Sequence, residues 1–522
     1  MRAIISVATR DGLPELARDL QKHGVNIFST SGTLNYLKTV GIEAESVGTL
    51  TQFPEILGGR VKTLHPTILG GILARRDLPE HSKELQAHAI VPIDIVVVNL
   101  YPFAETIAHP DTTLSDAQEQ IDIGGVTLIR AAAKNFQDVI VIVRPQDYVT
   151  VMQEWDELGE VSQETRRRLA AIAFQHTANY DTTIAQYLRI SSVDSFPDEL
   201  TLPLKRLQTL RYGENPHQRA AFYRWAETPP TPTIPSVAGA DILHGKELSF
   251  NNLLDLDAAL TAVSTFTAPT VVIIKHTNPC GLAYGDTLVD AYKNAHAGDP
   301  ISAFGGIIGC NRRIDAATAQ EITQLFYEAI IAPDFTPEAL EILRKKKDLR
   351  LLATHCPIEP KSINTQALNA SRPDVRSVSG GLLVQTPDTV GEQATDYAAV
   401  TEREPTLEEV TDLMFAWKVV RHVKSNAIVL AHKLAVIGVG AGQMNRVASV
   451  QLAVEKAAER ARGSVLASDA YFPFADGVEA AAKAGVTAII QPGGSIRDDE
   501  AIRMANHYAI AMIFTGKRHF RH

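Results

Sequence analysis

The sequence predicts an α/β protein whose first part has a largely parallel sheet, and three observations support this fold class. Short apolar segments alternate with longer helical patterns from residue 1 to about 150 and again from about 205 to the end. The short segments are rich in Val and Ile, which favour buried strands. Stretches with Gly, Asn and Pro separate them from the helical patterns, as expected of turns. Alternating strands and helices are typical of parallel sheets that helices cover.

Length, composition and net charge limit the class of protein. At 522 residues the chain is too long for one core, and its length predicts about three or four domain-sized units. Hydrophobic residues make up 45% and charged residues 21%, which is ordinary for a globular enzyme. The net charge of -10 argues against a general nucleic-acid binder. An anionic substrate would therefore need local basic pockets.

The cysteines and the termini indicate the compartment. Cys280, Cys310 and Cys356 are odd in number and widely spaced, which excludes a disulfide framework and a standard zinc site and fits a reducing environment. The N-terminus passes directly into a predicted strand, and no run of apolar residues reaches membrane-spanning length. The sequence therefore predicts a cytoplasmic protein.

Successive strands and helices can be placed along the chain. In the first part, strands are predicted at residues 3–7, 26–29, 95–99 and 139–143. A helical run then covers residues 162–190, and residues 191–203 have the composition of a linker. In the second part, strands are predicted at residues 271–275, 307–309, 427–431 and 488–491. Residues 419–426 resemble residues 271–278, and a Gly-rich turn follows each, which weakly predicts two related α/β halves.

Lys275 and His276 come where the apolar strand 271–275 opens into a loop. Open α/β sheets place their chemistry at this end of a strand. Adjacent side chains of a strand point to opposite faces, so both can reach one substrate only if the strand breaks here. Pro279 and Gly281 are expected to supply the break. The alternative is a lysine at a strand end beside a histidine packed in the core, and a short motif does not decide between the two.

Two stretches of the first part have the composition of anion-binding loops. Residues 29–33 follow a strand and open a helix, and hydroxyl residues around a Gly at a helix N-terminus can cradle a phosphate. A simple N-cap is the alternative. In residues 58–66 two glycines let the backbone approach a ligand, and Arg60 and Lys62 would share one face if the segment is extended. A basic loop without a ligand is the competing interpretation.

Other polar residues of the first part complete a possible proton-transfer site. Tyr101 directly follows the strand 95–99. Asp122 precedes a Gly turn and a helix on which Arg130 and Lys134 lie four residues apart, on one face. A tyrosine, an aspartate and several basic residues around a phosphate pocket can move protons.

Zinc and dinucleotide motifs are incomplete. Pro279-Cys280 is similar to the Pro-Cys-x-x-Cys of zinc deaminases, but Ala283 stands at the second cysteine position and no His-x-Glu element is near. Zinc is therefore not expected. The glycines of residues 438–442 lack the last glycine of a dinucleotide fingerprint, where Gln443 stands.

The motifs together resemble one family. In family order they are residues 59–66, 99–103, 121–135, 173–181, 211–218, 275–281, 302–306 and 518–522. The sequence closely resembles the bifunctional purine biosynthesis enzymes that combine aminoimidazole carboxamide ribotide (AICAR) transformylase with inosine monophosphate (IMP) cyclohydrolase. The resemblance implies a methylglyoxal-synthase-like cyclohydrolase domain in residues 1–200. It also implies a transformylase in residues 201–522, built of two cytidine-deaminase-like α/β subdomains.

The resemblance implies the residues of formyl transfer from 10-formyltetrahydrofolate to AICAR. His276 is the implied base, and Lys275 the cation that stabilises the oxyanion or protonates the departing N10. The implied ribotide contacts are Arg211, Tyr212, Phe304, Gly305, Glu328, Asn426, Arg446 and Arg518. Asp476 is implied to face the folate.

For dehydrative ring closure of formyl-AICAR to IMP, the resemblance implies a second set of residues. The implied catalytic residues are Lys62, Tyr101, Asp122 and Lys134, with Arg60 and Thr63 beside them. Ser31, Gly32 and Thr33 would take the phosphate. Arg10 departs from the family, which has a lysine in this loop, and a guanidinium fork is not an ammonium point. Ligand contacts of this loop are therefore not carried over.

Two rival functions stay open at this point, a zinc-dependent nucleobase deaminase and a non-catalytic nucleotide-binding protein on the same scaffold. The Lys275-His276 pair argues against the second, because a sensor has no need of a base beside a cation. The family further implies a homodimer that acts on small molecules (AICAR, formyl-AICAR and folate), without zinc, nucleic acid or membrane. The sequence leaves open whether a monovalent cation binds.

Overall fold

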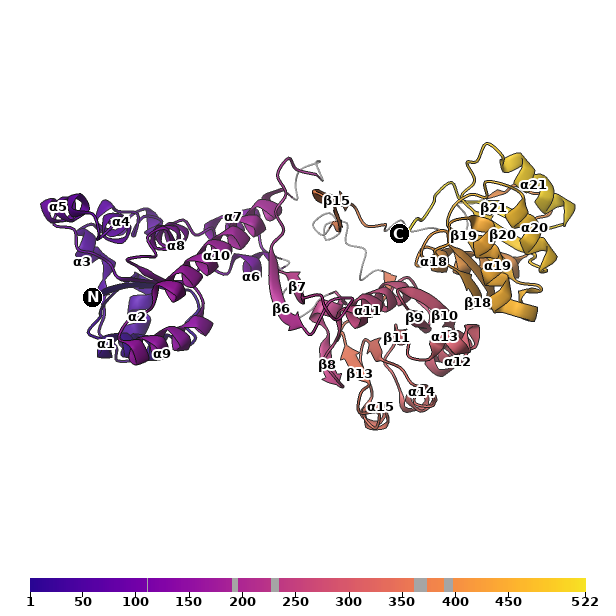
Figure 1. Ribbon diagram of the computed structural model, residues 1–522, viewed down its shortest axis with the longest axis horizontal. Helices are drawn as coiled ribbons and strands as arrows, with labels where there is room; N and C mark the ends of the chain where they lie inside the picture. Colours follow the sequence, from indigo (N-terminus) through magenta and orange to yellow (C-terminus); the bar gives the residue numbers. More distant parts are fainter. Residues whose placement is uncertain (110, 190–195, 227–233, 361–372, 389–397) are drawn as a thin grey trace. The chain divides into compact units, whose positions relative to one another are not determined.

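The computed structural model describes all 522 residues except 110, 190–195, 227–233, 361–372 and 389–397 (Figure 1). Of the predicted linker 191–203, residues 191–195 thus lie outside the described residues. The chain divides into two compact units, Met1–Lys205 with Trp225–Pro229, and Arg206–Arg224 with Pro230–His522. In the described ranges, no helix combines the length and apolarity needed to cross a membrane.

The first unit is built on a sheet in which every strand pairing is parallel. Its order among the described residues is β3-β2-β1-β4-β5. The strands are β1 (Arg2–Ser6), β2 (Asn26–Ser29), β3 (Glu45–Ser46), β4 (Ile95–Val98) and β5 (Ile140–Ile142). Every residue of β4 and β5 is buried, as expected of parallel strands covered on both faces. The predicted α/β class with a parallel first sheet is confirmed.

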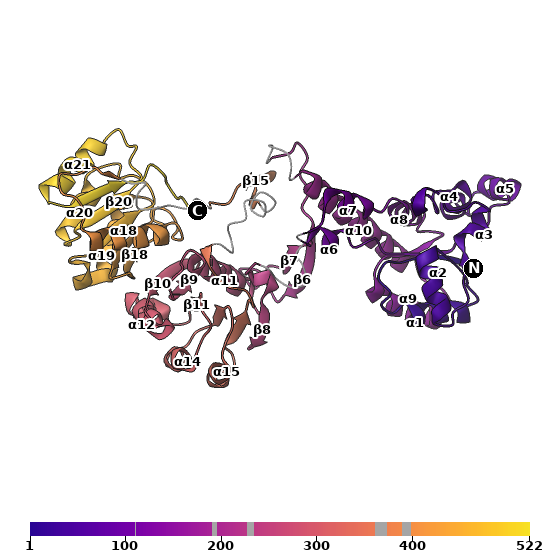
Figure 2. The same cartoon turned by 180° about the vertical axis from the view of Figure 1, so that it is seen from behind.

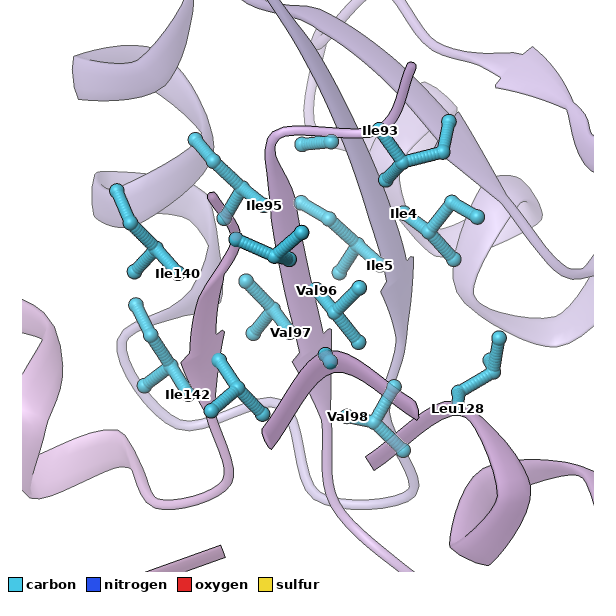
Figure 3. Close-up of a cluster of buried hydrophobic side chains, with 14 of the residues drawn as sticks. Ile4, Ile5, Ile93, Ile95, Val96, Val97, Val98, Leu128, Ile140 and Ile142 are labelled. Atoms are coloured by element: carbon cyan, nitrogen blue, oxygen red, sulfur yellow. The ribbon is translucent and has the colours of Figure 1, made fainter. Parts of the chain in front are cut away.

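Helices cover both sides of this sheet (Figures 1 and 2). Helix α8 (Gly124–Lys134) contacts β4, β5 and α10 (Gln163–Arg189), while α1 (Leu13–Lys22) contacts β2 and α9 (Tyr148–Leu158). Figure 3 shows the core, where Ile and Val side chains of the central strands meet Leu128 of α8. The other helices of this unit are α2 (Ser31–Thr39), α3 (Val47–Thr51), η1 (Leu57–Gly59), α4 (Pro66–Leu73), α5 (Pro79–Ala87), α6 (Phe103–Ile107), α7 (Leu114–Glu119) and η2 (Pro145–Asp147).

The second unit contains a 12-stranded sheet of order β16-β21-β20-β19-β17-β18-β10-β9-β11-β12-β13-β8 among the described residues. Its strands are β8 (Asp241–His244), β9 (Thr270–Lys275), β10 (Asn278–Tyr284), β11 (Ile307–Cys310), β12 (Ala329–Ala332), β13 (Arg350–Ala353), β16 (Ala398–Ala399), β17 (Ile428–His432), β18 (Ala435–Gly440), β19 (Val465–Ser468), β20 (Ala488–Gln491) and β21 (Ala511–Phe514). Two separate hairpins are formed by β6 (Leu204–Leu210) with β7 (Ala220–Trp225), and by β14 (Asp374–Val378) with β15 (Gly381–Gln385).

This sheet consists of two copies of one pattern, which meet where β10 pairs with β18. Each copy has an antiparallel hairpin, β9–β10 or β17–β18. The next strand, β11 or β19, is antiparallel to the first hairpin strand, and two parallel strands and an antiparallel edge strand follow. We call β8–β13 the first copy and β16–β21 the second.

The two related halves predicted from the sequence are therefore present, but the segments that suggested them do not correspond. Residues 271–278 form β9 and its turn, whereas residues 419–426 end a helix and precede β17. Short β-branched runs occur in buried helix ends as well as in strands, so their similarity was misleading.

The two opposite faces of the sheet pack into different hydrophobic clusters. Helices α11 (Phe250–Val263) and α18 (Leu407–Val420) share one cluster that spans both copies. The opposite face is covered in the first copy by α12 (Leu288–Gly298), α14 (Ala316–Ile322) and α15 (Pro337–Leu343). In the second copy it is covered by α19 (Arg446–Ala457), α20 (Asp476–Lys483) and α21 (Asp498–His507). Short helices are α13 (Pro300–Ala303), η3 (Val237–Gly239) and η5 (Ala458–Ala461).

Candidate active sites

Lys275 and His276 lie where β9 turns back into β10. His276 and Thr277 have φ values of 52° and 62°, and Lys275 pairs with Asn278 across them. Two residues with positive φ are what a two-residue hairpin of this kind requires. The strand therefore breaks at His276 itself.

The prediction that Pro279 and Gly281 break the strand is wrong. Both residues belong to β10, where a register shift against β9 falls between them. A proline is tolerated inside a strand at such an irregularity, because its missing N–H is not needed there. The left-handed backbone of the two preceding residues reverses the chain instead.

The amine of Lys275 faces the loop before β11. Its Nζ donates a hydrogen bond to the Phe304 carbonyl oxygen at 2.5 Å, and a Cβ at Gly305 would lie 3.2 Å from this Nζ. Gly305 has φ of 69° and donates its N–H to the Phe326 carbonyl at 2.8 Å. The Phe304 and Phe326 rings are 5.5 Å apart and both exposed. The structure thus brings the lysine together with Phe304 and Gly305, beside an open aromatic pair.

Glu328 belongs to the same end of the sheet. Its backbone N–H donates to the Gly306 carbonyl at 3.0 Å. Its carboxylate accepts a hydrogen bond from Arg350 at 2.7 Å, and Arg350 is buried. Arg350, which was not predicted from the sequence, fixes the direction of the Glu328 carboxylate.

Asn278 joins the hairpin to the second copy. Its side-chain oxygen accepts a hydrogen bond from the Lys424 N–H at 2.9 Å, and its amide nitrogen donates to the His276 carbonyl at 3.0 Å. Lys424 lies two residues before Asn426, whose side-chain nitrogen donates to the Gln443 carbonyl at 2.7 Å. The Asn278 side chain therefore joins His276 to the segment that leads to Asn426.

Arg446, predicted to contact the ribotide, is only 6% exposed. Its guanidinium donates to Asn426 at 2.7 Å, to Ser468 at 2.8 Å and to Asp469. The second carboxylate oxygen of Asp469 accepts a hydrogen bond from the Ser425 hydroxyl at 2.5 Å. Arg446 is thus engaged by protein groups, and its geometry is that of a support for Asn426.

The C-terminal segment is tied to the same place. The Ser425 N–H donates to the Arg521 carbonyl at 2.9 Å, and the His519 N–H donates to the Asp469 carbonyl at 3.0 Å. Arg518 lies just before this anchored stretch, with its guanidinium 4.6 Å from the centre of the Phe520 ring.

The remaining predicted transformylase residues lie on other elements. The guanidinium of Arg211 is 5.0 Å from the centre of the Tyr212 ring. Asp476 is the first residue of α20, and its carboxylate accepts a hydrogen bond from the Gly477 N–H at 2.7 Å. Among the described hydrogen bonds and ion pairs, none joins these three residues directly to Lys275.

In the first unit, Asp122 gathers several predicted residues. Its carboxylate accepts a hydrogen bond from the Gly125 N–H at 2.7 Å. Burial raises the pKa of this carboxyl above its ordinary value, while N–H groups of Gly125 and Tyr101 and the charge of Lys62 act in the opposite direction. The structure therefore brings Lys62, Tyr101 and Asp122 together.

Tyr180 completes this cluster and was not among the predicted site residues. Its hydroxyl oxygen accepts a hydrogen bond from the Asp122 N–H at 2.8 Å and donates to the Gln120 carbonyl at 2.9 Å. Burial raises the pKa of Tyr180 to about 12. The long helix α10 thus carries a phenol to the acidic residue that precedes α8.

The loop before α4 is not an extended segment at Arg60. Arg60 has helical φ and ψ at the end of η1. An extended segment, which would place Arg60 and Lys62 on one face, is therefore not formed. Arg60 instead forms an ion pair with Glu119 of α7. Thr63 is buried, and its hydroxyl lies 2.8 Å from where a Cβ at Gly124 would be. The absent side chain of Gly124 therefore lets α8 begin beside Thr63.

Among the four predicted catalytic residues of ring closure, Lys134 lies apart from the other three. It ends α8, whereas Asp122 precedes the start of this helix. An 11-residue helix rises by about 15 Å, so the two backbones are at opposite ends of it. Lys134 lines a groove of about 730 Å³ together with Arg130, Arg167 and Phe174.

The start of α2 has the form of an anion site. Its N-cap, Thr30, makes no side-chain cap and instead shares a 2.9 Å hydrogen bond with the Ser6 hydroxyl. Ser31 donates its hydroxyl to Glu55, and Thr33 is buried with its hydroxyl bound to the Val7 backbone. No heavy atom lies within 4 Å of where a Cβ at Gly32 would be. The backbone N–H groups of this first turn are therefore left without a side-chain cap.

The donor set does not suit zinc. Burial raises the pKa of the Cys280 thiol to about 12, which disfavours the thiolate that binds metals. In the part of the chain that the structure describes, no group of three or more His, Cys, Asp or Glu side chains is placed to hold a metal ion.

Comparison with known proteins gives a consistent family. The AICARFT/IMPCHase bienzyme family matches residues 132–456, and the MGS-like domain family matches residues 12–127. The bifunctional purine biosynthesis protein PurH of Anoxybacillus flavithermus is 54% identical over 521 residues, which cover 100% of this chain and 99% of the relative. PurH of Bacillus cereus is 52% identical with the same coverage. A solved structure, titled "Crystal structure of ForH", is 35% identical, covers 35% of this chain and 95% of its own, and has a TM-score of 0.33.

The match extends over both units and over nearly the full length of the relatives. The chain belongs to the AICARFT/IMPCHase bienzyme family, the bifunctional enzymes that carry out the AICAR transformylase and IMP cyclohydrolase steps of purine biosynthesis.

Proposed function

We propose that the two activities have separate sites. Residues 201–522 carry formyl transfer at Lys275 and His276, and residues 1–200 carry ring closure at Asp122 and its neighbours. The observation that carries the proposal is the left-handed backbone of His276, which ends β9 directly after Lys275. An ammonium group and an imidazole thereby stand at one strand end.

In formyl transfer the 5-amine of AICAR attacks the formyl carbon of 10-formyltetrahydrofolate. His276 takes a proton from the amine as the new C–N bond forms, a step worth on the order of a hundred- to ten-thousand-fold. Lys275, held by the Phe304 carbonyl, stabilises the oxyanion or protonates N10 as the bond to the formyl carbon breaks. The products are formyl-AICAR and tetrahydrofolate.

The ribotide is held by groups around this hairpin. Phe304 and Gly305 border the amine of Lys275, Glu328 is oriented by Arg350, and Asn426 by Arg446. The exposed ring of Phe304 offers a flat apolar surface to the substrate's ring. Contacts of Arg211, Tyr212, Arg518 and Asp476 with substrate or folate stay predictions.

In ring closure the carboxamide nitrogen of formyl-AICAR attacks its own formyl carbon, and water is lost. Both reacting atoms belong to one molecule, so the enzyme mainly orients them and moves protons. Asp122 and Tyr101 exchange these protons, and the raised pKa of the buried Asp122 carboxyl brings it closer to the working pH. Lys62 stabilises negative charge on the formyl oxygen.

The phosphate of formyl-AICAR lies at the start of α2. Its binding groups are the N–H groups of Ser31, Gly32 and Thr33, which have no side-chain cap. Arg60 and Thr63 lie in the loop before α4, beside Lys62. Lys134 stays a prediction, since it is at the far end of α8 from Asp122.

The decisive assay mixes pure protein, AICAR and 10-formyltetrahydrofolate and follows tetrahydrofolate and IMP separately. Lys275→Ala is expected to stop formyl transfer but still to cyclise supplied formyl-AICAR. Lys62→Ala is expected to accumulate formyl-AICAR. Lys433→Ala, in the equivalent turn of the second copy, and Lys83→Ala, on α5, are controls that should retain both activities. If either site variant lost both activities while folded, the two-site proposal would fail.

The family also implies a homodimer whose subunits share transformylase sites, and light scattering of the purified protein tests the dimer. The cytoplasm is the expected location.

A further inference from the structure

Asp255, on α11, faces the turn that carries His276. Its Oδ1 accepts a hydrogen bond from the Thr277 N–H at 2.6 Å, and the neighbouring His276 N–H lies close enough to this carboxyl to lower its pKa. These are the two residues with φ of 62° and 52°. One carboxylate therefore faces both left-handed amides of the hairpin and accepts a hydrogen bond from the second.

The second copy of the fold repeats this arrangement. Asp412 on α18 accepts hydrogen bonds from the N–H groups of Lys433 at 2.8 Å and Leu434 at 2.7 Å. Those two residues have φ values of 51° and 58°. Asp255 and Asp412 are each the sixth residue of a 14-residue helix. The carboxylate is thus a feature of the repeat, and its effect can be compared between copies.

In both copies the carboxylate stabilises a turn whose backbone conformation is unfavourable. A left-handed conformation costs a non-glycine residue on the order of 1 kcal/mol or more, so two in succession need compensation. Hydrogen bonds from backbone N–H groups to a carboxylate are charge-assisted and stronger than neutral ones. They offset the cost of a turn that contains no glycine.

Only in the first copy does this turn carry a proposed catalytic residue. There the turn places an imidazole next to the strand-end lysine, whereas the second copy has Lys433 and Leu434 in the turn. The charges of His276 and Lys275 both act on the Asp255 carboxyl, and burial raises its pKa. A negative group at this place stabilises the positive charge that forms on the imidazole when it takes a proton from the substrate.

We propose that Asp255 is a positioning residue for formyl transfer. It fixes the direction of the His276 imidazole by anchoring the turn amides, and its charge stabilises this imidazole after it has taken the proton. The inference rests on the proposed role of His276 as the base.

Helix α11 also contacts the polar stretch 211–218, which the sequence predicts to bind the ribotide. Asn251, one turn before Asp255, donates its side-chain N–H to the Glu214 carbonyl at 3.4 Å. Glu214 lies in the polar stretch 211–218, which includes the predicted ribotide contacts Arg211 and Tyr212. Helix α11 is therefore placed to keep the base and this binding loop in register.

The test compares Asp255→Asn with Asp412→Asn in the full-length enzyme. Each change keeps the side-chain size, removes the charge and turns one acceptor oxygen into a donor. We expect Asp255→Asn to lower kcat of formyl transfer by about a hundredfold, the usual cost of a misplaced catalytic group. KM for AICAR should change little and cyclisation of supplied formyl-AICAR should be parental, so the loss should fall on kcat of formyl transfer alone. Asp412→Asn should stay within about threefold of the parent in both activities, because it acts outside the reacting groups.

A charge-retaining variant separates the two effects. Asp255→Glu keeps the charge but displaces it, so it should retain more kcat than Asp255→Asn, and it replaces Asp255→Asn in the comparison if the latter does not fold. Parental kcat in the folded Asp255 variant would overturn the inference, and so would an equal loss in Asp412→Asn. His276→Ala distinguishes the failures, since parental formyl transfer in that variant overturns the proposed function itself.

Discussion

The side-chain oxygen of Asn278 accepts a hydrogen bond from the Lys424 N–H at 2.9 Å, and this contact joins the two copies of the repeat. The same side chain donates to the His276 carbonyl at 3.0 Å. One amide therefore holds the turn with the proposed base against the segment that leads to Asn426. Groups from different copies act on one substrate only if such contacts keep them aligned.

Asn278→Ala should consequently impair formyl transfer alone. Both hydrogen bonds are lost, and we expect kcat to fall by roughly tenfold to a hundredfold, as for other changes that misplace a catalytic group. Asn278→Asp keeps the acceptor for Lys424 and loses the donor to His276, so its loss should be smaller. Asn506→Ala, which removes a comparable contact to Glu402, is the control. Parental kcat in Asn278→Ala would show that this bridge does not align the site.

Asp122 predicts a pH dependence of ring closure. Burial raises the pKa of its carboxyl, so the folded protein keeps this group protonated to a higher pH than an exposed aspartate. A base must be ionised, so cyclisation of supplied formyl-AICAR should rise with pH, with a midpoint above that of an ordinary aspartate. Asp122→Asn should remove this rise and lower kcat by on the order of a hundredfold or more, with formyl transfer unchanged. Asp116→Asn on α7 serves as the control. A profile with the same acidic limb in Asp122→Asn would assign the titration to another group.

The strands of the first unit were predictable because of their composition. Residues 26–29 match β2, whose apolar pair Ile27-Phe28 is buried. Residues 95–99 match β4 within one residue, since a continuous β-branched run is typical of a buried strand in a parallel sheet. β3 was missed because it has two residues, Glu45 and Ser46, without an apolar pattern. β10 was missed for another reason. The turn before it is made by His276 and Thr277, which have no turn propensity, and Asn278-Pro279 suggested a loop instead.

A site was predictable where its reactive side chains are neighbours in the sequence. Lys275 and His276 stand together in the chain, so their pairing needs no tertiary information. Arg446 and Asp469, or Asp122 and Tyr180, meet only through the fold, and each is an ordinary polar residue in its own segment. The supporting residues Asp255, Arg350 and Asp469 were missed for this reason.

Gly438 and Gly440 have a packing role. A Cβ at Gly440 would lie 1.9 Å from the Ser449 carbonyl oxygen of α19, and one at Gly281 would lie 1.9 Å from the Ala295 carbonyl oxygen of α12. Gly440→Ala should lower the free energy of unfolding by about 1–3 kcal/mol or more, because the helix must move away from the strand. Gly381→Ala is the control, since no heavy atom lies within 4 Å of its added methyl. Chemical denaturation of both variants measures the difference, and an unchanged Gly440→Ala would contradict this close packing.

His176 predicts that the first unit loses stability in mild acid. Its Nε2 is buried and has no hydrogen-bond partner among the described residues. Burial, with the charges of Lys205 and Arg144, lowers its pKa from 6.5 to about 4. Between these values the unfolded chain binds a proton that the folded chain does not, so the free energy of unfolding falls as the pH falls. At pH 5 the loss from this group is about 2 kcal/mol relative to neutral pH.

His176→Phe removes the titration and should therefore flatten this part of the pH dependence. Hydrogen exchange of α10 peptides in the intact protein, at pH 7 and pH 5, measures the local free energy of opening. The parent should lose about 2 kcal/mol more than His176→Phe over this interval. His88→Phe, the same change at an exposed position just after α5, should keep the parental dependence. Equal acid losses in the parent and in His176→Phe would mean that this histidine is not the neutral, buried group that its surroundings require.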